Sequence, residues 1–348
     1  MATGKASWEQ ARTLIEKEAG PVTSVTEISG GLNSEISVIV RTDHDATFVK
    51  GRRADHPRAW TQERERLINP LVRHISAPLK WSAAGDDWNL LGFECVPGAH
   101  ADYSPGSRDL PKVTDTLRQL QDIALPGGTE VKQAGQRWAA YTPAPELLAG
   151  TSLLHTEWTP GNVLVSDRAR LVDWAWPTRG AAWIDPACLT VWLIASGHTP
   201  RSAESWAARI PSWHTAPAGA LAEFARIQAL MWEGIAADSG GQWTANLARA
   251  ARQWASHRQT RLPPPGNANE RNQRAQVHPA QRLSAPDGTV ADIDTEIVPL
   301  VRALWALGLA TTASCQDFGE GTAGQRETGL YPSRYGGDAF IAYYTGWA

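Results

Sequence analysis

A short polar loop between two apolar runs carries the side chains best suited to chemistry. Residues 153–174 read LLHTEWTPGNVLVSDRARLVDW, in which His155, Glu157 and Asn162 form the pattern H-x-E-x-x-x-x-N and Asp173 follows the second apolar run. A carboxylate can accept the proton of a substrate hydroxyl, while amide and carboxylate oxygens are ligands that Mg²⁺ prefers together with nucleotide phosphates. The spacing therefore predicts a phosphoryl-transfer loop, with Asn162 and Asp173 as the metal ligands.

This loop resembles the catalytic loop and the metal-binding Asp of the aminoglycoside phosphotransferase family, relatives of choline kinases and protein kinases. The family pattern is H-G-D-x-x-x-x-N, followed by an apolar strand that ends in I-D-W. The resemblance implies catalytic roles for His155, Glu157, Asn162 and Asp173. It also implies ATP and Mg²⁺ as cofactors and a small-molecule hydroxyl compound as the phosphate acceptor.

The upstream elements of the family follow in the expected order. Lys50 ends a predicted strand, at the place of the family lysine that binds the ATP phosphates. Gly30, Gly31 and Ser34 lie in the turn between the first two predicted strands, where the family has its nucleotide loop. The turn lacks the G-x-G-x-x-G of protein kinases, so phosphate binding would depend on the two glycines and on backbone amides near Ser34.

The helix predicted over residues 58–75 offers two candidate partners for Lys50. Glu63 and Glu65 both flank its apolar face, so helix geometry leaves the choice between them open. The family pattern R-E favours Glu65 as the residue that orients the lysine.

A hinge segment is the last element of the resemblance. Residues 90–98 read LLGFECVPG and resemble the family segment whose backbone meets adenine, which implies nucleotide contacts at Glu94 and Val96. The resemblance as a whole covers about residues 22–257.

Two positions depart from the family pattern. Glu157 replaces the catalytic Asp, and the extra methylene moves the carboxylate by about an ångström, a displacement that can cost about 10²-fold in rate. The alternative to an active kinase is therefore a pseudokinase that binds nucleotide or a protein partner. Asp185 matches the family's G-D-P motif, but Leu189 stands where a second Asp is expected. Asp185 could cap a helix or hold the catalytic loop.

Other readings of the loop lead to different roles. His155 could brace the loop through a ring nitrogen rather than act in catalysis. The sequence His155-Thr156-Glu157 with Cys188 superficially resembles a zinc deaminase, but one His and one Cys are too few for the three protein ligands of catalytic zinc.

Composition limits the partners and the compartment. The 33 basic and 36 acidic residues leave a net charge of -3, which provides no electrostatic reason to expect nucleic acid. Cys95, Cys188 and Cys315 are too few and too scattered for a disulfide framework, so a reducing cytoplasm is expected. No secretion signal or membrane span is predicted, because the longest apolar stretch, residues 189–195, is far shorter than a membrane helix. The oligomeric state stays open.

The charge of the second lobe bears on the acceptor, which this family holds mainly with its helices. Residues 200–258 contain six arginines (201, 209, 226, 249, 252 and 258) and four acidic residues (204, 223, 233 and 238). A polycationic aminoglycoside would prefer the opposite balance. A neutral or weakly charged hydroxyl compound is at least as well suited.

The predicted architecture is α+β, with the two lobes of a protein-kinase-like fold and a short C-terminal α/β appendage. Residues 1–98 form a small antiparallel-sheet lobe that binds nucleotide, and residues 99–261 form a helical lobe with the catalytic loop. Residues 262–289, rich in Pro, Asn, Gln and Arg, are predicted to be a linker. Residues 290–348 form a small module that either packs on the main body or is incomplete.

Hydrophobic periodicity places the individual elements. Strands are predicted over residues 22–28, 35–41, 46–50, 79–82, 88–95 and 339–344, and helices over 7–18, 58–75, 112–123 and 293–309.

Tryptophan is unusually abundant, with 17 residues against five Phe and two Met. Five of them gather in or just after the predicted catalytic and metal-binding loops: Trp158, Trp174, Trp176, Trp183 and Trp192. Most are expected to fill the core in place of Phe and Met. Trp158 adjoins Glu157 and could instead form an aromatic wall for the acceptor.

Overall fold

The computed structural model describes residues 5–28, 34–85, 87–217, 219–259, 280–284, 290–306, 310–315 and 340–344. The chain divides into two units, residues 1–261 and 262–348. Each unit has hydrophobic core residues of its own.

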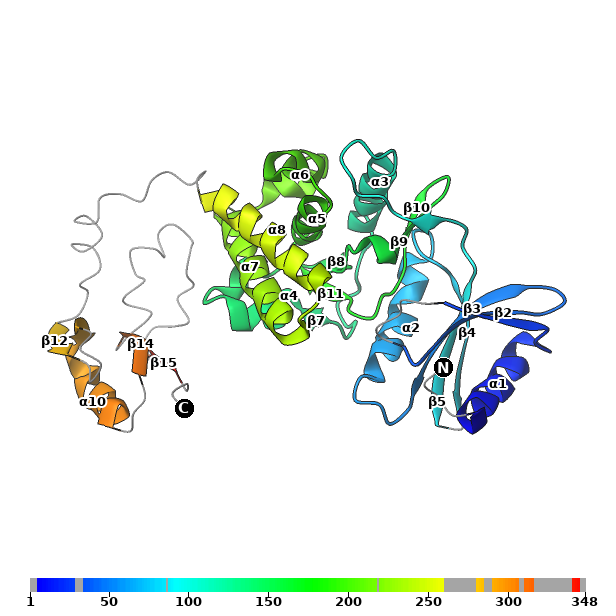
Figure 1. Ribbon diagram of the computed structural model, residues 1–348, viewed down its shortest axis with the longest axis horizontal. Coiled ribbons are helices and arrows are strands. Elements are labelled where there is room, and N and C mark those ends of the chain that lie inside the picture. The colour runs from blue at the N-terminus through cyan, green and yellow to red at the C-terminus, as the bar shows by residue number, and fades with distance from the viewer. Residues whose placement is uncertain are drawn as a thin grey trace. The chain divides into compact units, whose positions relative to one another are not determined.

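The N-terminal lobe of the first unit is a five-stranded antiparallel sheet (Figure 1). Its strands, β1 (Ser24–Glu27), β2 (Ile36–Arg41), β3 (Ala46–Arg53), β4 (Leu79–Gly85) and β5 (Trp88–Glu94), lie in the order β1-β2-β3-β5-β4. Buried and partly exposed residues alternate along β2, because successive side chains point to opposite faces of a sheet. Helix α1 (Lys5–Ala19) buries Ala11 and Ile15 against one of these faces.

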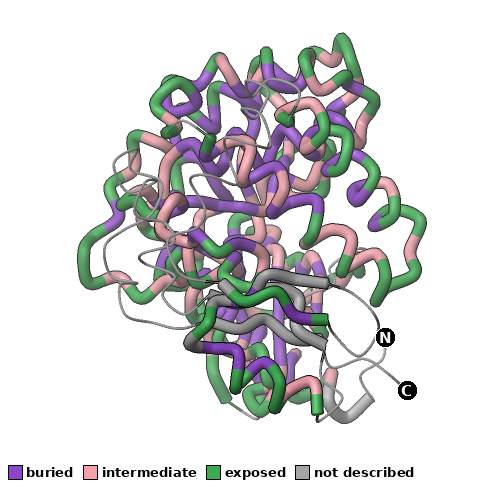
Figure 2. Tube along the Cα trace, turned by 90° about the vertical axis from the view of Figure 1, so that its left-hand side faces the viewer, coloured by how far each residue is buried: buried purple, intermediate pink, exposed green. Residues whose placement is uncertain are grey.

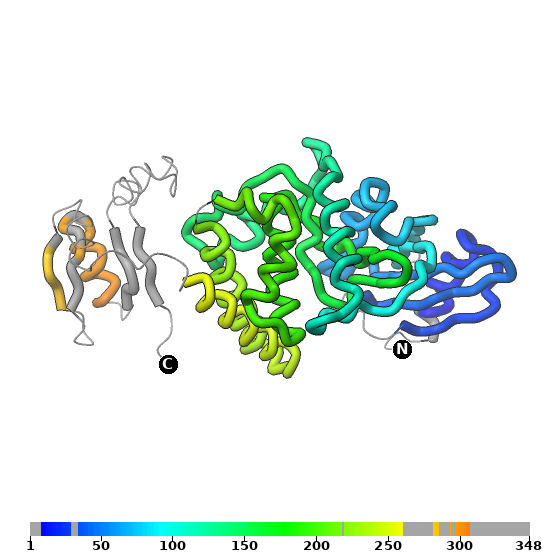
Figure 3. The backbone as a smooth tube through the Cα atoms, turned by 90° about the horizontal axis from the view of Figure 1, so that it is seen from above, coloured from blue at the N-terminus to red at the C-terminus, as the bar shows by residue number. Residues whose placement is uncertain are grey.

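Helix α2 (Trp60–Val72) connects the sheet to the helical lobe and lies between them in Figures 1 and 3. Ile68 and Val72 belong to the core of the helical lobe, whereas Glu65 reaches back to β3. Strand β3 continues to Arg53, three residues beyond its predicted end, so Lys50 lies inside the strand and is paired with Leu91 of β5. Pairing on both sides of β3 extends the strand past the lysine.

The C-terminal lobe of the first unit is mainly helical. Its helices are α3 (Leu110–Gln121), α4 (Ala134–Trp138), α5 (Ile184–Ala195), α6 (Pro200–Ala207), α7 (Ala220–Ser239) and α8 (Gln242–Gln259), with short 3-10 turns η1 (Ala139–Tyr141), η2 (Pro145–Leu148), η3 (Pro160–Asn162) and η4 (Pro211–Thr215). In Figure 2 buried and exposed residues recur in turn along the helices, as expected where one face of each packs inward. Among the described residues, no helix has both the length and the apolar character needed to cross a membrane.

Two small sheets in this lobe frame the predicted catalytic loop. One has the order β10-β9-β6, built from β6 (Ala99–His100), β9 (Val163–Val165) and β10 (Ala169–Leu171). The other has the order β7-β11-β8, built from β7 (Lys132–Gln133), β8 (Ser152–Leu154) and β11 (Thr178–Gly180). The loop leaves β8 and enters β9, so both of its ends are fixed by strand pairing.

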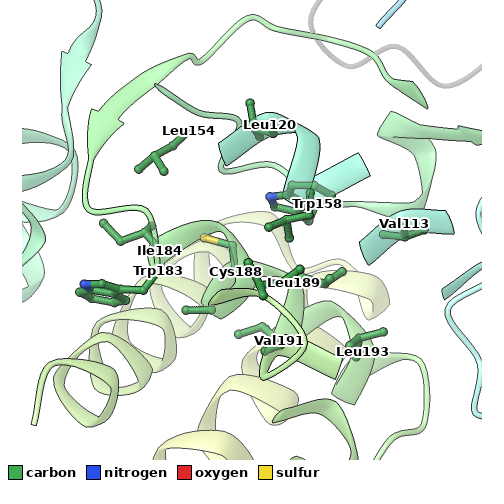
Figure 4. Close-up of a cluster of buried hydrophobic side chains, with 14 of the residues drawn as sticks. Val113, Leu120, Leu154, Trp158, Trp183, Ile184, Cys188, Leu189, Val191 and Leu193 are labelled. Carbon is green, nitrogen blue, oxygen red and sulfur yellow. The ribbon is translucent and has the colours of Figure 1, made fainter. Parts of the chain in front are cut away.

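Tryptophans fill the core beneath this loop. Trp158 has no exposed surface, and it lies with Leu154, Trp183 and Cys188 in the buried cluster of Figure 4. Trp174 is also fully buried. The expectation that these rings are core residues is confirmed, and the alternative that Trp158 lines the acceptor site is wrong, because no part of the ring meets solvent.

The second unit differs from the sequence prediction in two places. It contains β12 (Ala280–Ser284), β13 (Val290–Asp294), η5 (Thr295–Ile297), α10 (Val298–Ala306), β14 (Ala310–Cys315) and β15 (Phe340–Tyr344). The linker predicted over 262–289 thus includes β12, which pairs antiparallel with β13. Ile293 lies in β13 rather than in the helix predicted over 293–309. Leu283 and Ile293 are buried in one cluster, and this pairing overrides the helical spacing of the apolar residues.

Candidate active site

Lys50 lies in the paired strand β3 with its ammonium between two carboxylates. Its Nζ is 2.7 Å from Glu65 Oε2 and 2.8 Å from Asp173 Oδ1. Burial by itself would lower the pKa of Lys50, but the two carboxylates outweigh burial and raise the pKa above its usual value. The lysine is therefore a fixed positive charge at the junction of the two lobes.

The structure separates the two glutamates that helix geometry left equivalent. Glu65 is buried and binds Lys50, while Glu63 is exposed and forms an ion pair with Arg66. Burial raises the pKa of Glu65, and Lys50 opposes that effect. The backbone N–H of Trp174 donates to Glu65 Oε1 at 3.3 Å, which joins α2 to the residue after Asp173.

Asp173 lies two residues after β10, which ends at Leu171. Its φ of 63° is in the left-handed region, which Asp tolerates better than most residues. The preceding residue, Val172, donates its N–H to Asn162 O at 2.9 Å. Val163 and Leu171 are paired across β9 and β10, so Asn162 and Val172 lie side by side just beyond that pair. This register brings the two predicted metal ligands to the same end of the sheet.

Asp185 holds the catalytic loop. It lies in the first turn of α5, and its two carboxylate oxygens accept the backbone N–H groups of His155 and Thr156 at 2.9 and 2.8 Å. Thr156 has a φ of 69°, a strained conformation for a β-branched residue. Burial raises the pKa of Asp185 to about 6. The structure therefore assigns Asp185 to the loop rather than to a helix cap.

His155 braces the same loop from inside. Its Nε2 donates to Val172 O at 3.0 Å, and its Nδ1 accepts the N–H of Glu157 at 3.3 Å. Burial lowers the pKa of His155 to about 4, so the ring is neutral, with the proton on Nε2. The ring of Trp174 packs against it edge-on, with centroids 4.6 Å apart. Because both ring nitrogens are used within the protein, the contacts of His155 are those of a bracing residue.

Glu157 faces a cation that sequence reasoning missed. Arg137 Nη2 is 3.6 Å from Glu157 Oε1, and the side chains are 17% and 28% exposed. Burial raises the pKa of Glu157 to about 7, and Arg137 limits the rise. Arg137 belongs to the short helix α4, well upstream of the loop, and no motif in the sequence marks it.

Asn162 and Asp173 form a donor set that fits a magnesium ion. Asn162 ends the short turn η3, and its Nδ2 donates to Glu157 O at 3.2 Å. In the described parts of the chain, no donor reaches the amide oxygen of Asn162, which leaves it available for a cation. A neutral amide oxygen and a carboxylate are hard ligands of the kind that Mg²⁺ prefers.

The predicted nucleotide-binding residues have different outcomes. Gly30 and Gly31 lie outside the described residues, whereas Ser34 is described and half-buried. Glu94 is exposed at the end of β5, and its N–H donates to Pro78 O at 2.8 Å. Val96 is half-buried.

An apolar cluster beside Val96 was also missed from the sequence. It extends from β3 and β5 to the residue before Asp173, and its members are Phe48, Ala77, Leu79, Leu91, Phe93, Val96 and Val172. The segments are far apart in the sequence and only the fold brings them together. Ala77, Leu91 and Phe93 are its buried members, and the others are partly buried and pack against them.

No protein-family model and no curated protein matches the chain. The crystal structure of the choline kinase LicA from Streptococcus pneumoniae is similar, with a TM-score of 0.51 and 15% identity over 72% of this chain and 100% of that chain. LicA in complex with AMP matches with a TM-score of 0.51 and 15% identity over 73% and 100% of the two chains.

A third similar structure is a putative fructosamine-3-kinase from Haemophilus somnus 129PT, with a TM-score of 0.49 and 11% identity over 71% of this chain and 97% of that chain. The agreement with LicA extends over the whole of that protein. The kinase-like fold that the sequence resemblance implies is thereby confirmed. The chain has a two-lobed kinase-like fold, and the match to the choline kinase LicA covers 72% of its length.

Proposed function

We propose that this protein is an ATP- and Mg²⁺-dependent kinase that transfers the γ-phosphate to a hydroxyl group of a small molecule. The observation that carries the proposal is the Lys50 ammonium held at 2.7 and 2.8 Å by Glu65 and Asp173. Glu157 and Asn162 lie on the loop beside it, joined by a hydrogen bond between the Asn162 amide and the Glu157 carbonyl. This set supplies a cation for phosphate, two metal ligands and a base.

On the nucleotide side, Lys50 would bind the α- and β-phosphates while Glu65 keeps it oriented. The phosphates would then replace Asp173 as the second anionic partner of the lysine. Mg²⁺, when bound through Asn162 and Asp173, would neutralise charge on the transferring phosphate. The adenine ring would pack on the apolar cluster around Val96 and Val172, beside Glu94 of the hinge.

On the acceptor side, Glu157 would receive the hydroxyl proton. The acceptor oxygen forms a bond to the γ-phosphorus, the bond from that phosphorus to the bridging oxygen of ADP breaks, and the hydroxyl proton passes to the Glu157 carboxylate. A base with a pKa of about 7 is well matched to neutral pH. His155 and Asp185 hold the loop during this step.

The acceptor we propose is neutral or carries little charge. The helical lobe has six arginines against four acidic residues over 200–258, a balance that would repel a polycation. A compound with a single positive charge, such as the choline named for LicA, belongs in the test panel beside neutral sugars and alcohols. We propose the cytoplasm, where ATP is abundant, as its location.

Nucleotide binding is the first test. Thermal unfolding is measured with ATP alone, Mg²⁺ alone and both together, because a ligand at 100 times its Kd stabilises by about 2.7 kcal/mol. ATP with Mg²⁺ is expected to raise the midpoint most. A midpoint unchanged in all three conditions would contradict nucleotide binding and with it the proposed function.

Phosphoryl transfer is the second test. ADP release is measured with a panel of hydroxyl acceptors, and each product is checked by mass spectrometry for one added phosphoryl group. Glu157→Gln is expected to abolish transfer while retaining ATP binding. Nucleotide binding without turnover on any acceptor would instead favour the pseudokinase, in which Glu157 no longer acts as a base.

A further inference from the structure

The ion pair between Arg137 and Glu157 gives a reason for the unusual glutamate in the catalytic loop. We propose that Arg137 is a positioning residue for Glu157, and that this pairing makes Glu rather than Asp the carboxylate that suits this site. The inference rests on the proposed function and adds to it a residue that the kinase pattern in the sequence does not contain. In this proposal Arg137 acts on the reaction only by holding Glu157, and it does not itself bind a substrate.

The guanidinium of Arg137 is held from several sides. Its Nη1 donates to the carbonyl of Trp176 at 3.5 Å, and its Cζ lies 5.5 Å from the ring centroid of Trp138 and 5.4 Å from that of Trp176. Aromatic faces attract a cation at such distances. The charge therefore has a defined place beside the loop, although it is largely removed from water.

The length of the glutamate matches this placement. Arg137 Nη2 and Glu157 Oε1 are 3.6 Å apart, close to the limit of an ion pair. Removing one methylene would draw the carboxylate back by about 1 to 1.5 Å, the length of one carbon–carbon bond. An Asp on the same backbone would lose Arg137 and leave a largely buried cation without its carboxylate, which is costly.

The same arginine is linked to helix α2 through two tryptophans. Trp176 packs edge-on against Trp60 of α2, with centroids 4.9 Å apart and planes at 86°. Arg64 in turn lies 4.3 Å over the Trp60 ring. Helix α2 also carries Glu65, so one helix supports both the lysine and, through Trp60 and Trp176, the cation that holds Glu157.

The test is a double-mutant cycle on turnover. The kcat and the KM for ATP are measured for wild type, Glu157→Asp, Arg137→Gln and the double variant, using hydrolysis of ATP by water and transfer to the best acceptor of the panel. Each single change is expected to lower kcat by about tenfold or more while the KM for ATP changes by less than about twofold. The double variant is expected to be no slower than the slower single variant, because both changes break the same contact.

Two further variants separate positioning from general damage. Arg137→Lys keeps the charge and is expected to retain more of the wild-type kcat than Arg137→Gln. Arg179→Gln is the matched control, because Arg179 on β11 is partly buried and binds the carbonyls of Leu125 and Pro126, with no carboxylate partner among the described residues. It is expected to leave kcat unchanged. Thermal midpoints of all variants show whether each one is folded.

The proposal is overturned if Glu157→Asp is as fast as or faster than wild type, or if the two single effects multiply in the double variant. If wild type binds ATP but transfers phosphate to nothing, the proposed function fails, and with it the role of Arg137 in turnover. The pairing is then decided by urea unfolding. The coupling free energy between Arg137→Gln and Glu157→Gln is compared with that between Arg179→Gln and Glu157→Gln. If the first is no larger than the second, the pairing of Arg137 with Glu157 is overturned.

Discussion

The candidate site contains two ionic groups, and they are built differently. Lys50 and Glu65 are 9% and 4% exposed as side chains, with contacts of 2.7 and 2.8 Å from the lysine to its two carboxylates. Arg137 and Glu157 are 17% and 28% exposed and lie 3.6 Å apart. The pair of Lys50 and Glu65 is short and deeply buried, whereas the pair of Arg137 and Glu157 is longer and partly exposed.

This difference matches the roles that we propose for the two groups. A cation that binds phosphates functions best with a fixed position and a fixed charge, so deep burial between carboxylates suits it. A base must gain and lose a proton and meet a substrate, so it needs access and a pKa near neutrality. The short, buried contacts of Lys50 suit the proposed nucleotide site, and the partial exposure of Glu157 suits the proposed acceptor site.

Removing the lysine tests the tight group and has the largest expected effect. Lys50→Met leaves Glu65 buried without its partner, and breaking such a pair costs about 3–5 kcal/mol. The free energy of unfolding in urea should fall by that amount, and stabilisation by ATP should disappear. Lys80→Met is the control, since Lys80 pairs with Asp45 at the surface and an exposed pair is worth about 0–1 kcal/mol. Equal losses in the two variants would contradict the buried pairing.

Acid should loosen the loop that carries Glu157. The pKa of His155 is lowered to about 4 from 6.5, so the native state binds fewer protons than the unfolded state between these values. The stability that neutral His155 contributes is complete above pH 6.5 and is lost as the pH falls towards 4, by about 3 kcal/mol in total.

The measurement compares wild type with His155→Gln across this range of pH. Asp185, with its pKa raised to about 6, titrates in the opposite sense, because its protonated form is favoured in the native state. Because both proteins contain Asp185, its contribution cancels in the difference between their unfolding free energies. A difference that stays constant from pH 7 to pH 4 would rule out a buried, neutral His155.

Replacing Asp185 tests whether turnover depends on the hydrogen bonds that hold the loop of Glu157. Asp185→Asn can accept only one of the two backbone N–H groups through its amide oxygen, and leaving the other unpaired should cost about 1–3 kcal/mol. Turnover should fall with little change in ATP binding, because the Lys50 group does not contact Asp185. Calorimetric ATP titration beside the kinetic assay measures both. Parallel loss of ATP affinity would show that the two groups are not separable.

The smallest effect is expected where α2 connects the two groups. Trp60→Ala removes the edge-on contact with Trp176, which is worth about 0.5–1.5 kcal/mol beyond the buried area. Trp243→Ala is the matched control, because Trp243 makes a similar edge contact with Trp232 away from the loop. Both variants should lose comparable stability, but only Trp60→Ala should lower kcat, by a fewfold. Identical kcat values for the two variants would show that α2 does not help to position Glu157.

The candidate residues of the loop could be found from the sequence because one linear pattern contains them, whereas Lys50 was assigned from the order of the elements in the family. His155, Glu157, Asn162 and Asp173 stand within one stretch of the chain, and local spacing limits how far apart they can be. The choice between Glu63 and Glu65 was open from helix geometry, since both flank the same face, and a resemblance was needed to make it. The errors in the second unit arose where strand pairing overrode helical spacing.

What the sequence by itself determined is the order of the elements and the chemical types on the loop, because hydrophobic periodicity and close spacing are local properties. Only the tertiary structure decided which carboxylate meets Lys50, that Asp185 holds the loop, and that Arg137 faces Glu157. These pairings join residues far apart in the chain. In each case a buried charged group needs a partner on another packed element. Because such partners come together only in the folded chain, no fixed spacing in the sequence predicts them.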